Sequence, residues 1–165
     1  MKPAVIPAAL LALVHLLAPA AAPAEEVSGR ARVVDGDTLE IAGRRVHLRG
    51  VDAPEPAQEC TSRKGKTYRC GLQSIRYLEG LVRHQELTCA GETGADGTLV
   101  AQCKISWLDL NSQVVLDGWA LSDVPGGDPY RREEDAARAR REGLWRGGQV
   151  DNPWDWRAAR GAAGR

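Results

Sequence analysis

The sequence has no excess of charge of either sign. Its 165 residues include 22 lysines and arginines and 22 aspartates and glutamates, so the formal net charge at pH 7 is zero. Proteins that coat nucleic acid through bulk charge are strongly basic. The composition therefore argues against that class, but it does not exclude an enzyme that binds one phosphate group locally.

The sequence also has no apolar run as long as a membrane-spanning helix requires, which is about 20 residues. The one candidate, residues 4–17, follows Lys2 and is interrupted by a proline and a histidine. Ala22-Pro23-Ala24 then supplies the small residues that a signal peptidase requires. We therefore expect a signal peptide over residues 1–24. The mature protein is expected to be exported, periplasmic or extracellular, and free of the membrane once the signal is removed.

No C-x-x-C motif occurs, which argues against a zinc site. The expected mature chain nevertheless contains four cysteines, and an even number in an oxidising compartment predicts two disulfides. Three pairings are possible, and we prefer the one that closes a polar loop and links two neighbouring strands across a glycine-rich turn. These pairs are Cys60–Cys70 and Cys89–Cys103.

The sequence does contain a two-part acidic pattern. Asp35-Gly36-Asp37-Thr38 follows one β-type run, and Asp52-Ala53-Pro54-Glu55 ends a second. If the two runs form a hairpin, their carboxylates converge on one corner. Like charges so close raise each other's pKa, so such a corner needs a cation. Oxygen ligands without nearby histidine or cysteine ligands favour Ca²⁺ or Mg²⁺. For the first motif alone, a simple Asp-Gly turn is the alternative.

The remaining pattern predicts a mainly β protein with added helices. Three β-type runs are followed by an amphipathic helix and two further strands, which is the order of a five-stranded OB-fold barrel. Two more helices would pack on it. The expected elements after the acidic corner are a helix over 71–83, strands over 86–90 and 99–105, and helices over 108–119 and 130–142. The domain would span residues 25–157, with a flexible tail over 158–165.

Residues 30–55 resemble the signature of the staphylococcal nuclease family, and the likeness is weaker beyond them. The resemblance implies an OB-fold barrel that holds one Ca²⁺ ion and hydrolyses phosphodiester bonds of DNA and RNA. It also implies that Asp37 and Asp52 are metal carboxylates and that Ala53 offers a backbone carbonyl. In the same comparison Glu55 matches the general base that activates the attacking water.

The sequence departs from this family at the two positions where arginines contact the phosphate. These positions hold His47 and Thr98. Because transition-state arginines in phosphoryl transfer contribute about 10³ to 10⁵ in rate, we expect weak activity. Arg45, His47 and Arg49 alternate along one strand and share a face. Arg49 or a protonated His47 is therefore the expected catalytic replacement, with Arg45 and Thr98 as further substrate contacts.

Together these features predict an exported, Ca²⁺-dependent nuclease that acts as a monomer on single-stranded DNA or RNA. The alternative is a catalytically silent homologue, a metal-dependent module that binds nucleic acid, a polyanion or a protein. Three tryptophans near the C-terminus are expected to pack over the barrel in either case. They are Trp145, Trp154 and Trp156.

Overall fold

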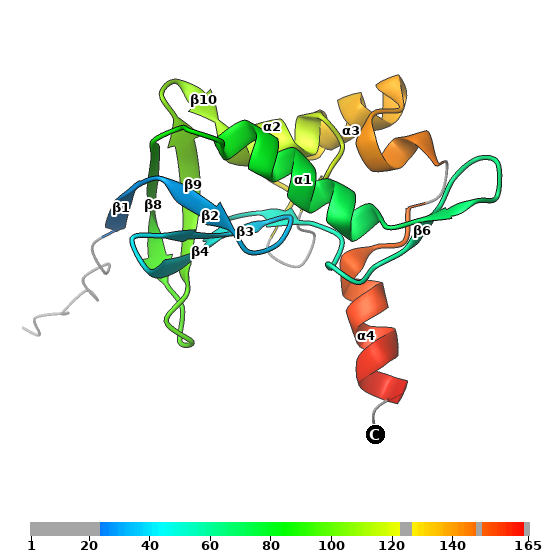
Figure 1. The fold of residues 1–165 in the computed structure, drawn as a ribbon, viewed down its shortest axis with the longest axis horizontal. Coiled ribbons are helices and arrows are strands. Elements are labelled where there is room, and N and C mark those ends of the chain that lie inside the picture. Colours follow the sequence, from blue (N-terminus) through cyan, green and yellow to red (C-terminus); the bar gives the residue numbers. More distant parts are fainter. Residues whose placement is uncertain (1–23, 123–126, 148–149, 164–165) are drawn as a thin grey trace, which may run out of the picture.

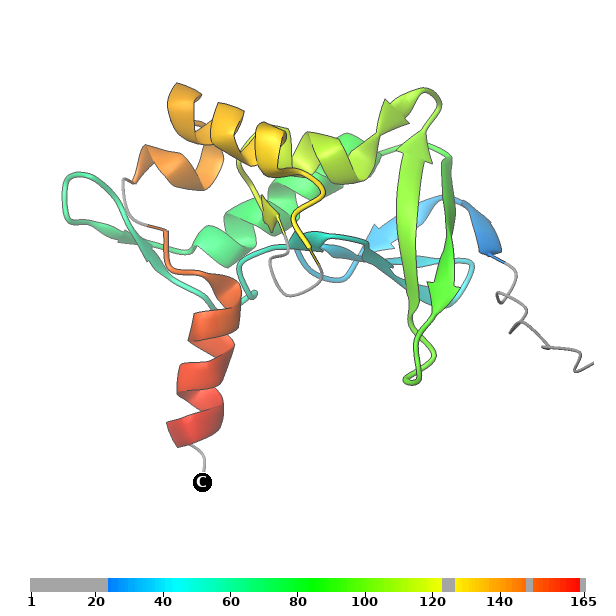
Figure 2. The ribbon, with the colours of Figure 1, turned by 180° about the vertical axis from the view of Figure 1, so that it is seen from behind.

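The computed structural model describes residues 24–122, 127–147 and 150–163 (Figure 1). The expected signal peptide lies outside the described residues except for Ala24. Within the described ranges, no helix is long and apolar enough to span a membrane. The protein is built on a strongly curved mixed sheet with helices packed against it (Figures 1 and 2).

The main sheet closes on itself through its first two strands. Its path is β1-β8-β9-β4-β3-β2, and β10 adds to β9. Only Arg30 separates β1 from β2, so the two ends of this path belong to one stretch of chain. The strands are β1 (Glu25–Gly29), β2 (Ala31–Val33), β3 (Thr38–Ile41), β4 (Arg44–Leu48), β8 (Leu87–Thr93), β9 (Leu99–Ile105) and β10 (Leu108–Asp109). With β1 and β2 counted as one strand, this is the expected five-stranded barrel, and the predicted fold class is confirmed.

The core lies inside this curved sheet because apolar and polar residues alternate along its strands. In β8 the buried positions include Leu87 and Cys89, and in β9 they include Leu99, Ala101 and Cys103. Cys89 pairs directly with Cys103 across the two strands, and their disulfide lies in the core. The second disulfide joins Cys60 to Cys70. Both preferred pairings are confirmed.

Three helices lie close to their predicted positions. They are α1 (Cys70–Val82), α2 (Leu110–Leu116) and α3 (Arg131–Arg140). Helix α2 begins later than predicted because Leu108 and Asp109 pair with β9 as β10. The Asp109 side chain then caps the helix by accepting a hydrogen bond from the Ser112 amide at 3.1 Å. In Figure 2, α2 and α3 lie together at the same end of the barrel.

The C-terminal region contains a helix that was not predicted from the sequence. After a short 3₁₀ helix, η1 (Gly143–Arg146), the chain forms α4 (Pro153–Ala163). Residues 158–165 are the expected tail, and α4 includes those up to Ala163. Trp145 and Trp154 pack in a second apolar cluster around the Cys60–Cys70 disulfide. The axis of α4 points away from the barrel (Figure 1).

Short strand pairs position the segments between these elements. β5 (Val51–Asp52) pairs with β11 (Leu121–Ser122), and β6 (Cys60–Thr61) pairs with β7 (Thr67–Tyr68). The first pair holds Asp52 at the rim of the barrel. The second forms the base of the loop that leads into α1.

Candidate functional site at the barrel rim

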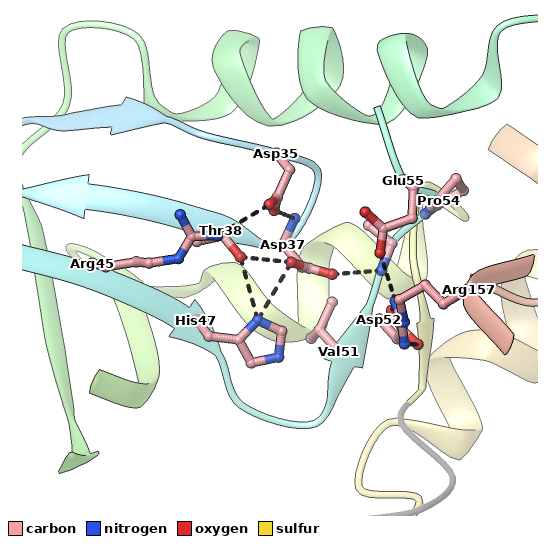
Figure 3. Close-up of a pocket in the computed structure, with 11 residues that line it drawn as sticks. Asp35, Asp37, Thr38, Arg45, His47, Val51, Asp52, Pro54, Glu55 and Arg157 are labelled. Carbon is pink, nitrogen blue, oxygen red and sulfur yellow. Dashed lines mark hydrogen bonds and ion pairs between the residues drawn. The ribbon is translucent and has the colours of Figure 1, made fainter. Parts of the chain in front are cut away.

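A pocket of about 340 Å³ opens at the rim of the barrel, where the β2–β3 turn faces β4 and the chain after β5 (Figure 3). Four carboxylates and three nitrogen-bearing side chains contribute to its walls. The lining residues are Asp35, Asp37, Thr38, Arg45, His47, Val51, Asp52, Ala53, Pro54, Glu55 and Arg157. The two acidic motifs of the sequence therefore converge, as predicted from their places at the ends of neighbouring strands.

The β2–β3 turn is shaped by local hydrogen bonds and by one glycine. The amides of Val34 and Asp35 donate to the Thr38 carbonyl at 2.9 and 3.2 Å, and Asp35 accepts a hydrogen bond from the Asp37 amide at 3.2 Å. A Cβ on Gly36 would lie 2.6 Å from the Cβ of Ala53. The absence of a side chain at position 36 thus lets the first acidic motif approach the second.

Asp37 is a buried carboxylate in the wall of the pocket. Its Oδ2 accepts a hydrogen bond from the Ala53 amide and its Oδ1 accepts one from the Thr38 hydroxyl, both at 2.8 Å. The Nδ1 atom of His47 lies 3.3 Å from Oδ1. Burial alone would raise the pKa of Asp37, but the contacts with His47 and the Ala53 amide lower it to about 2. Asp37 is therefore charged at neutral pH.

The other groups beside Asp37 respond to its charge. Burial, followed by the hydrogen bond and negative charge of Asp37, raises the pKa of Asp35 to about 6. Burial disfavours the charged form of His47, yet the hydrogen bond and charge of Asp37 outweigh it and raise the pKa of His47. The repulsion expected between crowded carboxylates thus raises the pKa of Asp35 and not that of Asp37. The same negative charge favours the protonated form of His47.

Arg157 enters the pocket from α4 and was not identified from the sequence. Its Nη1 and Nη2 donate to Oδ1 and Oδ2 of Asp52 at 2.9 and 2.7 Å, and Nη1 also donates to Oε1 of Glu55 at 2.8 Å (Figure 3). The hydrogen bond to Asp52 is the main cause of the raised pKa of Arg157. The Asp52 side chain is only 10% exposed, so the guanidinium neutralises a largely buried charge.

The other predicted phosphate contacts divide into two groups. Arg45 lines the pocket, with Nη2 3.6 Å from Oδ2 of Asp35. Arg49 does not line it, because its Nη2 donates to the Val100 carbonyl at 3.0 Å. Thr98 lies in the β8–β9 turn, where its hydroxyl donates to Asp96 at 2.9 Å. Neither Arg49 nor Thr98 therefore belongs to the pocket as it stands.

The predicted metal ligands suit a hard cation by their chemistry. Asp37 and Asp52 contribute carboxylate oxygens to the pocket, the ligand type that Ca²⁺ prefers. Among the described residues, however, no three histidine, cysteine, aspartate or glutamate side chains are grouped closely enough to hold a metal ion. Both oxygens of Asp52 accept hydrogen bonds from Arg157. An ion at this position would have to share Asp52 with the guanidinium or displace it.

A barrel of this topology with a carboxylate-lined pocket at its rim defines an OB-fold protein with a candidate active site. The family model described as "Staphylococcal nuclease homologue" matches residues 45–147, which is more than half of the chain, and the chain belongs to this family. The matched segment contains Asp52 and Glu55. It includes neither Asp37 nor Arg157.

Three curated relatives are similar over most of the chain. "Succinoglycan biosynthesis protein ExoI" of Rhizobium meliloti (strain 1021) is 37% identical over 127 residues, 74% of this chain and 66% of that protein. "Micrococcal nuclease" of Shigella flexneri is 29% identical over 143 residues, 78% of each chain. "Probable staphylococcal-like nuclease CAN2" of Oryza sativa subsp. japonica is 26% identical over 133 residues, 76% of this chain and 33% of that protein. The chain thus spans just under two thirds of the first relative and a third of the last.

Proposed function

We propose that this protein is an exported, Ca²⁺-dependent nuclease of weak activity that hydrolyses phosphodiester bonds of DNA or RNA. The observation that carries the proposal is the convergence of Asp37, Asp52 and Glu55 on one pocket in a member of the staphylococcal nuclease family. The relative from Shigella flexneri is named a micrococcal nuclease, which agrees with this activity.

In this proposal Asp37, Asp52 and the carbonyl of Ala53 hold one calcium ion. The bound ion supplies positive charge that favours a phosphate in the pocket. Glu55 acts as the general base: it takes a proton from a water molecule as the water oxygen bonds to phosphorus. The bond from phosphorus to the leaving sugar oxygen breaks, and that oxygen takes up a proton from solvent. The Glu55 side chain is 29% exposed, so water has access to it.

We expect weak activity because the two phosphate-contacting arginines of the family are replaced in this chain. His47 replaces one phosphate-contacting arginine and is engaged with Asp37. Thr98 replaces the other and is bonded to Asp96 outside the pocket. Because such arginines contribute about 10³ to 10⁵ in rate, their loss leaves much of the transition-state charge unbalanced.

Export is supported by the two disulfides, because disulfides persist in oxidising compartments. We further propose that the protein acts as a monomer and that its substrate is single-stranded DNA or RNA.

The second candidate is a catalytically silent, metal-dependent binding module. The contact that favours it is the pairing of Arg157 with both Asp52 and Glu55, which occupies one proposed metal ligand and the proposed base together. Its ligand would be nucleic acid, another polyanion or a protein.

Cleavage of a single-stranded DNA oligonucleotide separates the two candidates. Purified mature protein is assayed with calcium and with a chelator, beside Glu55→Gln and the control Glu59→Gln. Glu59 is exposed and lies outside the pocket. Since general-base catalysis contributes about 10² to 10⁴ in rate, we expect calcium-dependent cleavage that falls at least about 10²-fold in Glu55→Gln and is kept in Glu59→Gln. Equal background cleavage in wild type and Glu55→Gln would leave only the binding module.

A further inference from the structure

A nuclease site needs a cation that contacts the phosphate, and few side chains here are placed to supply one. Among the described residues, the pocket is lined by three nitrogen-bearing side chains, those of Arg45, His47 and Arg157. His47 is engaged with Asp37, and Arg45 lies toward Asp35 on the far side of the pocket (Figure 3). Of these three described side chains, that of Arg157 is the one that lies beside Glu55, the proposed base.

The position of Arg157 is built into the fold. Gln58 is fully buried; its side-chain carbonyl accepts a hydrogen bond from the Glu55 amide at 3.1 Å, and its Nε2 donates to the Asp151 carbonyl at 2.8 Å. The buried side chain of Gln58 therefore links the backbone of Glu55, the proposed base, to the segment just before α4. Trp154, in the first turn of α4, packs in the apolar cluster beside the Cys60–Cys70 disulfide. These contacts direct Arg157 toward the pocket independently of its own ion pairs.

The guanidinium retains capacity for a ligand. It carries five N–H donors in a planar fork, and three of them make the hydrogen bonds to Asp52 and Glu55. Five minus three leaves two N–H groups, and the side chain is 46% exposed. A planar fork of this kind matches two oxygens of a phosphate, which the compact ammonium of lysine does not.

We propose that Arg157 is the phosphate-binding arginine of this site, delivered by α4 in place of the cations missing at His47 and Thr98. This inference rests on the proposed nuclease function and names the residue that contacts its substrate. A phosphate in the pocket first meets the two remaining N–H groups, and it then competes with Glu55 for the Nη1 donor. As the fork turns to the phosphate, Oε1 of Glu55 is released to accept a hydrogen bond from water. Substrate binding thereby frees the base.

The test compares Arg157→Ala and Arg157→Lys with Arg160→Ala in the mature protein. Arg160 lies one turn further along α4, stacked 4.1 Å from the ring centre of Trp156 and outside the pocket, so its variant is the matched control. Three experiments are made: steady-state kinetics giving kcat and KM for single-stranded DNA with calcium, equilibrium binding of a phosphorothioate oligonucleotide as a function of salt, and thermal unfolding. The binding is measured with calcium and again with chelator.

We expect kcat to fall about 10³-fold in Arg157→Ala, to recover in part in Arg157→Lys, and to stay within about twofold in Arg160→Ala, since that residue contacts no pocket group. The slope of log affinity against log salt should also lose about 0.7 in Arg157→Ala, the share of one phosphate contact on a single strand. Arg157→Lys keeps a charge for Asp52 and serves as the decisive variant if Arg157→Ala does not fold. The proposal is overturned if Arg157→Ala cleaves DNA at the wild-type rate or faster and its salt slope is unchanged. Arg157 would then have only a structural role, through its ion pairs with Asp52 and Glu55.

Failure of the proposed function is recognised separately. If wild type and Glu55→Gln show the same background cleavage, the nuclease assignment fails and the binding arm decides the role of Arg157. A smaller salt slope in Arg157→Ala then still supports phosphate contact by Arg157. An unchanged slope overturns it.

Discussion

Arg157 and Asp52 form a bidentate ion pair, with donor–acceptor distances of 2.9 and 2.7 Å, although 105 positions separate them in the sequence. The pair attaches α4 to the barrel rim and supplies the positive charge that a nearly buried carboxylate requires. It therefore bears on stability as well as on the site.

Replacing Arg157 with leucine should lower the free energy of unfolding in the absence of metal. Asp52 would lose the guanidinium that donates to both of its oxygens, and a hydrogen bond to a charged group is worth about 1.5–3 kcal/mol. Added calcium should restore part of the loss, because the ion can take the place of the guanidinium at Asp52. Urea unfolding with and without calcium measures both effects, and Arg160→Leu is the control. A variant as stable as wild type in chelator would show that the ion pair contributes nothing net.

Asp37→Asn should weaken calcium binding at least tenfold. The substitution preserves the shape of the side chain but removes the charge of a proposed ligand, and hard cations depend strongly on carboxylate charge. Isothermal titration with calcium gives the affinity directly. Asp96→Asn, which removes a carboxylate in the exposed β8–β9 turn, should bind calcium like wild type. Equal affinity in Asp37→Asn and wild type would remove Asp37 from the ligand set.

The contribution of Tyr77 to the stability of the folded protein should decrease in alkaline solution. Burial, together with a hydrogen bond that its hydroxyl donates to Asp117, raises the pKa of Tyr77 above its ordinary value of 10.0. The unfolded chain loses this proton near pH 10 while the folded protein keeps it, so the contribution to stability is full below pH 10 and declines as pH rises above it.

Urea unfolding at pH 8 and pH 11 tests this dependence. The free energy of unfolding should fall less between the two pH values in Tyr77→Phe than in wild type. Tyr130, with a pKa raised to about 12, titrates in both proteins and cancels in the comparison. The same decline in both proteins would contradict the assignment.

The disulfide inside the barrel should contribute about 3 kcal/mol to stability, because it closes a loop of 14 residues in the unfolded chain. The double variant Cys89→Ala with Cys103→Ala removes it without leaving a polar group in the core. Thermal unfolding of this variant, beside wild type under oxidising and reducing conditions, measures the loss. Reductant should destabilise wild type more than the variant, and an equal response would indicate that this bridge is not formed in the isolated protein.

The sequence predicted the acidic corner because the relevant information is local. Asp37 and Asp52 stand at the ends of short strands, and Thr38 of β3 pairs with His47 of β4 in the sheet. Alternation and turn residues were sufficient to place these groups near one another. That pattern did not predict the direction of an exposed arginine. Arg49 was expected to share a strand face with Arg45, yet it lies just beyond the end of β4 and donates to the Val100 carbonyl instead of lining the pocket.

Arg157 was missed because nothing in its local sequence relates it to Asp52. Its helix, α4, is rich in small and charged residues, and no helix was expected in this part of the chain. A signal was nevertheless present at the start of α4. Asn152 precedes Pro153, a residue suited to the first helical position, and its side chain donates to Asp155 at 3.2 Å. This start would have predicted the helix, whereas its docking against Glu55 depends on the buried Gln58, a tertiary contact that sequence pattern does not reveal.

Restoring arginines at the two altered family positions should raise nuclease activity. His47 lines the pocket, so an arginine there enters it directly beside Asp37. Thr98 precedes Leu99, which pairs in parallel with Val46, so an arginine at position 98 begins near the strand that carries Arg45. We expect His47→Arg alone to increase kcat/KM on single-stranded DNA more than Thr98→Arg alone, because only the first position already faces the pocket.

The double variant should gain about 10³-fold, the lower range for one well-placed arginine in phosphoryl transfer. Thr67→Arg adds one positive charge, as each single variant does, at an exposed position of β7 and should leave the rate near that of wild type. This control separates a local contact from a general effect of charge. The gain should also require calcium and Glu55, so a chelator or Glu55→Gln must abolish it. If neither arginine increases calcium-dependent cleavage, the pocket does not present a phosphate to these positions, and the binding module becomes the better account of the site.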